Sequence, residues 1–131
     1  MIDHVSIGVR DLARAAAFYD TVLAAIGFAK LRAKPTTIGY GKAYPEFWIN
    51  ARPDRPAGAD TGLHVCLRAP STQAVDAFHA AALKAGGASG GAPGLRPEYN
   101  DRYYAAFVVD PDGNKIEAVT FLPPTIARSP D

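Results

Sequence analysis

Hydrophobic and polar residues alternate in two short segments that lie sixty residues apart, at 2–9 and 62–69. Each segment would place its apolar side chains on one face of a β-strand: Val5, Ile7 and Val9 in the first, Leu63, Val65, Leu67 and Ala69 in the second. The opposite face then carries His4 in the first strand and His64 in the second. We therefore predict two equivalent strands, each with one imidazole on a face that its own helix does not cover.

A helical pattern follows each of these strands. Asp11 is suited to cap the first helix, and Gly27 is suited to end it in a left-handed conformation. Ser71 is suited to cap the second helix, which we expect to end at Gly86 and Gly87. The two halves match without a gap through these helices. Self-similarity that occurs twice indicates two similar modules that close on one another.

Further strands are expected after each helix. In the first half they lie at 28–32, 36–42 and 45–50. In the second half we expect a weak strand near Ala88 and two strong strands at 103–109 and 115–121, joined by a tight turn at 110–114. The glycine- and proline-rich stretch 90–100 predicts a long loop that forms a rim or lid over a ligand.

The chain length suits one domain, residues 1–131. Within it we expect module 1 at about 1–50, a linker at 51–61, module 2 at about 62–122, and a disordered or loosely docked tail at 123–131. Each module would run strand, helix, strand, strand, strand, which predicts an α+β fold.

Composition narrows the function classes. A formal charge of +1 with 21% charged residues gives no basic stripe, so nucleic acid is not an expected partner. The single cysteine cannot form an internal disulfide. No apolar leader and no apolar run of about 20 residues are present, so we expect a cytoplasmic protein that does not bind membranes.

Three side chains point to metal chemistry. Glu117 lies in the middle of the last predicted strand, an unusual place for a carboxylate unless its charge is paired. Together with His4 and His64 it makes a set of two imidazoles and one carboxylate, which suits a divalent metal with open coordination positions. An empty polar pocket is the alternative reading. The remaining histidine, His79, is expected on the surface or in the packing of the second helix.

The first strand and helix, with Asp11-Leu12-Ala13-Arg14, and the Asp110-Pro111-Asp112-Gly113-Asn114 hairpin leading to Glu117, resemble the vicinal oxygen chelate superfamily. This superfamily includes glyoxalase I, extradiol dioxygenases, fosfomycin-resistance enzymes and bleomycin-resistance proteins. The resemblance covers about residues 2–122. It implies two βαβββ modules that form a cup-shaped mixed sheet of eight strands with the helices outside. It also implies a homodimer, with the modules paired within one chain or between two.

The resemblance assigns roles to individual residues. It implies a divalent metal ion (Zn, Ni, Fe or Mn) held by His4, His64 and Glu117, with Glu117 also catalytic. The position of a fourth ligand in glyoxalase-type enzymes falls on Trp48, and Glu46, two residues earlier, could take its place. The glycine-rich stretch at 86–94 lacks the spacing of a phosphate loop, so we assign no nucleotide cofactor.

Aromatic and guanidinium groups are expected around this site. The candidates for substrate binding are Trp48, Arg68, Arg96, Arg102, Tyr103 and Tyr104. The arginines favour an anionic substrate, with exposed structural arginines as the alternative. The strand pattern does not reveal which of the two tyrosines faces inward.

We therefore expect a glyoxalase-like metalloprotein, a metal-dependent lyase or isomerase of a small oxygen-chelating substrate that is anionic or thiol-conjugated. The alternatives are an extradiol-type dioxygenase and a fosfomycin-resistance-like transferase. A non-enzymatic small-molecule binder of the bleomycin-resistance type is the alternative from another class.

Overall fold

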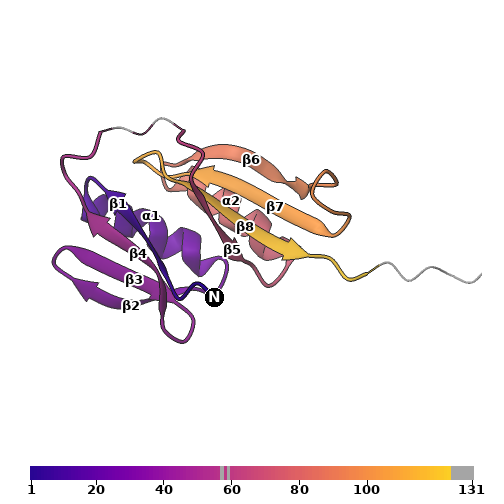
Figure 1. The fold of residues 1–131 in the computed structure, drawn as a ribbon, viewed down its shortest axis with the longest axis horizontal. Coiled ribbons are helices and arrows are strands. Elements are labelled where there is room, and N and C mark those ends of the chain that lie inside the picture. Colours follow the sequence, from indigo (N-terminus) through magenta and orange to yellow (C-terminus); the bar gives the residue numbers. More distant parts are fainter. Residues whose placement is uncertain (57, 59, 125–131) are drawn as a thin grey trace, which may run out of the picture.

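The computed structural model describes residues 1–56, 58 and 60–124. It contains two modules that lie side by side, each a four-stranded mixed sheet with one helix on its rear face in the view of Figure 1. Within the described residues, no helix is long and apolar enough to cross a membrane. Most of the predicted tail, at 125–131, lies outside the described residues.

The first module contains one helix and four strands. They are β1 (Val5–Val9), α1 (Leu12–Ala24), β2 (Ala29–Lys34), β3 (Thr37–Gly41) and β4 (Pro45–Ala51). The strand order is β1-β4-β3-β2, with β1 parallel to β4 and the other pairs antiparallel. The strand β1 is therefore an edge of its sheet.

The second module repeats this arrangement. It contains β5 (His64–Arg68), α2 (Thr72–Lys84), β6 (Ala88–Leu95), β7 (Tyr103–Val109) and β8 (Lys115–Phe121). The strand order is β5-β8-β7-β6, and β5 is parallel to β8. The prediction of two βαβββ modules is confirmed.

Local hydrogen bonds explain where the helices begin and end. The Asp11 carboxylate accepts from the backbone N–H of Arg14, and the Ser71 hydroxyl accepts from that of Ala74. Each helix thus begins with a capped backbone donor. After the helices the chain reverses through Gly27 at φ 89° and Gly86 at φ 97°, a conformation that favours glycine.

The stretch after α2 departs from the sequence prediction. The strand β6 continues to Leu95, so the long loop predicted at 90–100 is wrong over most of its length. Because β6 is an edge strand, it pairs with β7 alone. Pro93 lacks a backbone N–H, and this loss therefore affects at most one pair of strands. The irregular pairing with β7, shifted between Ser89 and Gly91 and again before Gly94, also accommodates the glycines. A short connection at 96–102 remains between β6 and β7.

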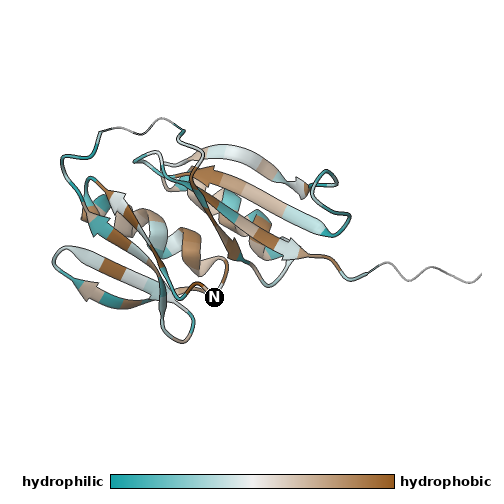
Figure 2. Ribbon diagram, viewed as in Figure 1, coloured by the Kyte–Doolittle hydropathy of each residue, from teal (hydrophilic) through white to brown (hydrophobic). Residues whose placement is uncertain are grey.

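The helices pack against each other as well as against their sheets, so the buried residues of both modules form one core. A Cβ atom on Gly87 of the second module would lie 2.6 Å from Cε2 of Phe18 in α1. The two modules are so close here that position 87 has no room for a side chain. In Figure 2, hydrophobic (brown) segments lie within β1, β5, β7, β8 and the helices, whereas hydrophilic (teal) residues gather in the loop that connects β6 to β7.

Candidate functional site

The sheet face opposite α2 carries the polar residues of β5. His64, Cys66 and Arg68 are exposed, whereas Val65 and Leu67 between them are partly buried, as the alternation predicts. Glu117 lies on β8 with its Cα opposite that of Cys66. Because β8 is flanked by β5 and β7, Glu117 is only 2% exposed although it belongs to the open face.

Glu117 is held from two sides. Its Oε1 lies 3.0 Å from Nε2 of His64, and its Oε2 accepts a hydrogen bond from the Tyr103 hydroxyl on β7. A buried carboxylate is stabilised only when its charge is paired or hydrogen-bonded, and these two contacts supply that. His64 keeps about two fifths of its side chain exposed. The pair therefore joins a buried anion to an imidazole that solvent or a ligand can reach.

The neighbours of Glu117 are kept protonated. Burial and hydrogen bonding to Glu117 raise the pKa of Tyr103. Loss of water around the thiol, together with the Glu117 charge, raises the pKa of Cys66 to about 12, although the residue retains exposed surface. Both groups are therefore neutral near pH 7, where they can donate hydrogen bonds toward the carboxylate.

A hollow of about 540 Å³ opens beside this network. The residues that matter for its chemistry are His64, Arg96, Tyr103, Phe107, Lys115 and Glu117. The hollow has the size of a small-molecule site. It combines one imidazole, one carboxylate, two fixed cations and an aromatic wall.

His4 lies outside this cluster. It is exposed, and its Nδ1 lies 2.8 Å from Asp3. It borders a second cavity, a groove of about 790 Å³ between β1 and β5, and His64 lies on the opposite wall of the same groove. Within the described residues, no three His, Cys, Asp or Glu side chains of one chain are close enough to hold a metal ion. One chain thus brings together two of the three predicted ligands.

Residues 1–118 match the family described as the Glyoxalase/Bleomycin resistance protein/Dioxygenase superfamily. The chain belongs to this superfamily. A solved glyoxalase/bleomycin resistance protein from Albidiferax ferrireducens is 34% identical, with a TM-score of 0.80 over 89% of this chain and 96% of that one.

Two further structures show the shared glyoxalase-superfamily fold. One is a glyoxalase/bleomycin resistance protein/dioxygenase family enzyme from Burkholderia phytofirmans, with 22% identity, a TM-score of 0.70, and coverage of 92% of this chain and 98% of that one. The other is a glyoxalase I mutant from Zea mays, with 24% identity, a TM-score of 0.66, and coverage of 88% of this chain and 45% of that one. No protein in the comparison with curated proteins matches the chain.

The position at which the resemblance implies a fourth ligand lies on β4. Trp48 pairs with Ser6 of β1 and is half-buried. Glu46, two residues earlier, borders the same groove as His4. The structure therefore places a carboxylate near His4, whereas the pair of His64 and Glu117 belongs to the other module.

Some of the residues predicted to bind substrate line the hollow, and the others lie elsewhere. Arg96 and Tyr103 line the hollow. The Tyr104 hydroxyl donates to Asp76 on α2 at 2.6 Å, so it lies on the helix-covered face. The Arg68 guanidinium lies 4.6 Å from the centre of the Phe121 ring and borders the groove.

Two other predicted positions also have partners elsewhere. Arg102 donates from Nε to the backbone oxygen of Leu122. Nε2 of His79 lies 2.8 Å from the Ser89 hydroxyl, which is consistent with a packing role. The structure does not bring either of them to the hollow.

Sequence reasoning missed Lys115 and Phe107, which line the hollow. The available signal was period 2: Lys115 precedes Glu117 by two residues on β8 and so shares its face. Phe107 is the antiparallel partner of Glu117 on β7. Only the strand pairing could place it there.

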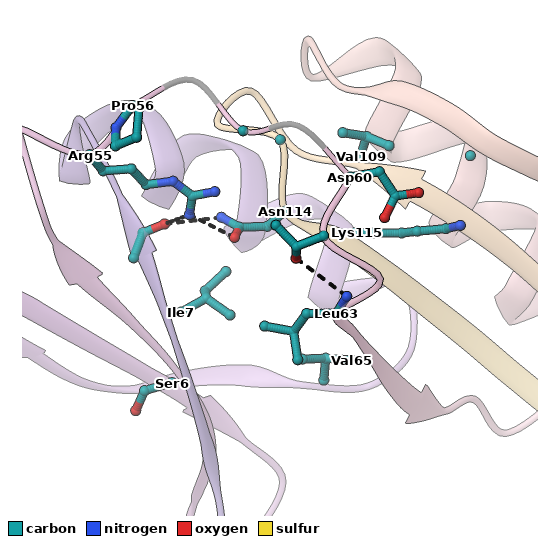
Figure 3. Close-up of a pocket in the computed structure, with 15 residues that line it drawn as sticks. Ser6, Ile7, Arg55, Pro56, Asp60, Leu63, Val65, Val109, Asn114 and Lys115 are labelled. Carbon is teal, nitrogen blue, oxygen red and sulfur yellow. Dashed lines mark hydrogen bonds between the residues drawn. The ribbon is translucent and has the colours of Figure 1, made fainter.

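A third cavity, of about 760 Å³, lies at the seam between the modules, where Arg55, Pro56 and Asp60 contribute to its lining (Figure 3). There Nη1 of Arg55 donates to the backbone oxygen of Gly8 at 2.6 Å and to Oδ1 of Asn114 at 2.8 Å. Asp60 is the one carboxylate among its described lining residues, which include no imidazole or thiol. The described residues around this cavity therefore provide no set of metal-ligand groups.

Proposed function

We propose that this protein is a glyoxalase-type metalloenzyme, a lyase or isomerase of a small molecule with adjacent oxygen atoms, and that two subunits share each metal site. The observation that supports the proposal is the contact between Nε2 of His64 and Oε1 of Glu117, 3.0 Å apart on an open sheet face. The hollow beside them gives a substrate access to both groups.

The donor chemistry fits a divalent metal. A neutral imidazole nitrogen and a carboxylate oxygen are common ligands of zinc, nickel, iron and manganese. Glu117 is buried, and a cation next to it would compensate its charge more fully than a hydrogen bond does. One chain supplies this pair, so we assign the third ligand to His4 of the partner subunit.

The surface around His4 supports a dimer. Ile2, Tyr44 and Leu63 are large hydrophobic residues with at least 48% exposure, and all three border the groove between β1 and β5. Apolar side chains gathered along one groove are typical of a surface that another protein covers. A second copy that covers the groove would bring one His4 to each His64–Glu117 pair.

The chain's own residues would orient the substrate and move a proton. The bound ion would act as a Lewis acid on the adjacent substrate oxygens. The Tyr103 hydroxyl fixes Oε2 of Glu117, so Oε1, which faces Nε2 of His64 at 3.0 Å, is the carboxylate oxygen that would accept a proton from the substrate. Phe107, 9% exposed, forms an apolar wall that limits water around this oxygen.

Metal analysis of protein purified without a chelator tests the proposal. We expect near-stoichiometric metal in the wild type and in the control His79→Ala, and its loss in His4→Ala, His64→Ala and Glu117→Gln. Metal retained in all three variants would refute the site. The hemithioacetal of glutathione and a catechol under air, assayed on metal-loaded protein, then distinguish isomerisation from ring cleavage.

A non-enzymatic binder of the bleomycin-resistance type is the second candidate. It is favoured by the finding that one chain brings only two of the predicted ligands together among the described residues. Wild-type protein that stays metal-free after incubation with each of the four metals, yet binds an aromatic ligand and quenches Trp48 fluorescence, would support the binder instead.

A further inference from the structure

We propose that the hollow recognises its substrate through an oxyanion, a carboxylate or a phosphonate-type group, held between Arg96 and Lys115. The inference rests on the proposed function, since it concerns the ligand of the same site. It adds a ligand class and assigns a binding role to Lys115.

Arg96 and Lys115 both lie next to the aromatic ring of Phe107. The guanidinium carbon of Arg96 lies 5.7 Å from the centre of the Phe107 ring, and Nζ of Lys115 lies 5.1 Å from it. The imidazole of His64 stands 5.8 Å from the same ring. Three basic groups therefore lie around the Phe107 ring in the hollow, and the buried Glu117 also lines this hollow.

Arg96 and Lys115 have no paired carboxylate in the part of the chain that the structure describes. Among the described residues, neither cation has a carboxylate oxygen within 4.0 Å. Glu117, the carboxylate that lines the hollow, is already engaged by His64 and Tyr103. Both cations are half-buried, and charges removed from water without a partner destabilise a fold. A bound anion would supply the missing counter-charge.

The Arg96 guanidinium is fixed before any ligand arrives. Its Nη1 donates to the Gly94 backbone oxygen at 2.9 Å, and its Nη2 donates to the Ala92 backbone oxygen at 2.7 Å. Lys115 projects from β8, a central strand; it borders the seam cavity, and in Figure 3 its side chain points away from Arg55. A fixed guanidinium loses little side-chain entropy on binding.

Glycine residues leave room for the anion. A Cβ atom on Gly91 would lie 3.1 Å from Cδ2 of Phe107 and 3.3 Å from Nη2 of Arg96. A Cβ atom on the neighbouring Gly90 would lie 3.2 Å from Cβ of Phe107. Side chains on this part of β6 would fill the space in front of Arg96. The planar guanidinium of Arg96 and the compact ammonium charge of Lys115 together favour a ligand group with two or more anionic oxygens.

Calorimetry on the metal-free protein of residues 1–131 in phosphate-free buffer tests the inference. The probes are phenylphosphonate and benzoate, which distinguish the two kinds of oxyanion, and benzamide as the uncharged counterpart. We expect at least one anion to bind and benzamide to bind at least about tenfold more weakly. Arg96→Gln and Lys115→Gln should each weaken anion binding about tenfold or more, and the double variant should abolish it.

Charge-matched controls are Arg32→Gln on β2 and Lys84→Gln on α2, which should leave the affinity within about twofold. Equal weakening by the controls, or unchanged affinity in the Arg96 and Lys115 variants, would overturn the inference, as would equal binding of benzamide. His64→Ala should lose metal but still bind the anion, whereas Lys115→Gln should keep metal. The anion site and the metal site can therefore fail separately.

Discussion

The hydroxyl of Tyr19 donates a hydrogen bond of 2.6 Å to Oδ2 of Asp110, and both residues are buried. Tyr19 lies on α1 of the first module, and Asp110 opens the turn between β7 and β8 of the second. This contact thus spans 91 positions of the chain and joins the modules at their core. Burial, followed by the Asp110 charge, raises the pKa of Tyr19, so the phenol remains a donor throughout the physiological range.

Tyr19→Phe should lower the free energy of unfolding by about 1–2 kcal/mol, because a buried carboxylate oxygen loses one donor. The loss is moderate because Asn114 Nδ2 still donates to the same oxygen at 2.9 Å. Urea denaturation measures it. The control Tyr99→Phe, at an exposed tyrosine, should change stability by less than about 0.5 kcal/mol. Equal effects would mean that the contact between modules contributes no stability.

Asp112 should make stability depend on acid pH. Burial disfavours its charge, but the hydrogen bonds from the Arg10 side chain and backbone and the charges of Arg14 and Arg10 outweigh burial and hold its pKa below the usual range. The folded state therefore gains stability that is complete above the unfolded pKa, near 4, and is lost as the pH falls through the lower folded value.

Asp112→Asn should accordingly lower the free energy of unfolding by about 2 kcal/mol at pH 7. Oδ2 of Asp112 has no hydrogen-bond partner among the described residues, so the new amide group would also be buried without an acceptor. Urea unfolding at pH 7 and pH 5 should give the same difference from wild type, and the difference should shrink only below about pH 4. A difference that disappears between pH 7 and 5 would contradict this origin.

A site shared between subunits predicts complementation. His4→Ala and His64→Ala should each lack metal as homodimers, but their heterodimer should recover one metal per dimer, because one of its two sites retains every ligand. Co-expression with two affinity tags and metal analysis of the doubly purified dimer measures this. The control heterodimer of His64→Ala with Glu117→Gln should recover none, since each of its sites has lost one ligand. No recovery in the first heterodimer would place the three ligands within one chain.

Gly91→Ala should impair ligand binding with little effect on folding. Its Cβ would approach Cδ2 of Phe107 to 3.1 Å and Nη2 of Arg96 to 3.3 Å, so both side chains must shift slightly. We expect phenylphosphonate affinity to fall about tenfold. In the matched variant Gly94→Ala the new Cβ would lie 3.4 Å from Nη1 of Arg96, an ordinary contact, and affinity should change less. Equal affinities with unchanged melting temperatures would show that Gly91 does not shape the hollow.

The parts of the fold that depend on neighbours in the sequence were predictable. Asp11 and Ser71 cap the helices because a short polar side chain reaches backbone donors three residues ahead. The turn at 110–114 follows from its proline, aspartate and glycine, and Gly113 has the expected positive φ of 91°. The alternation in β5 identified the face that carries His64. Glu117 was recognisable as a candidate because a carboxylate is unusual in the middle of a largely apolar strand.

Other features depend on pairing between distant strands. The glycine-rich β6 resembles a loop in sequence, and β7 makes it a strand by providing hydrogen-bond partners. Tyr103 and Tyr104 are adjacent and chemically identical, so only the direction of the β7 pleat places one on Glu117 and the other on Asp76. The role of Asp112 also required the first module, because Arg10 and Arg14 lie about a hundred positions away.

The sequence by itself determined the duplicated modules, their helix caps, the final hairpin and the types of residue that carry chemistry, because each depends on local propensity and periodicity. Only the tertiary structure decided that His64 and Glu117 meet while His4 stands on the other wall of a groove, and that Lys115 and Arg96 flank Phe107. These relationships depend on strand register and on how the two modules pack, which arise from contacts between residues far apart in the chain.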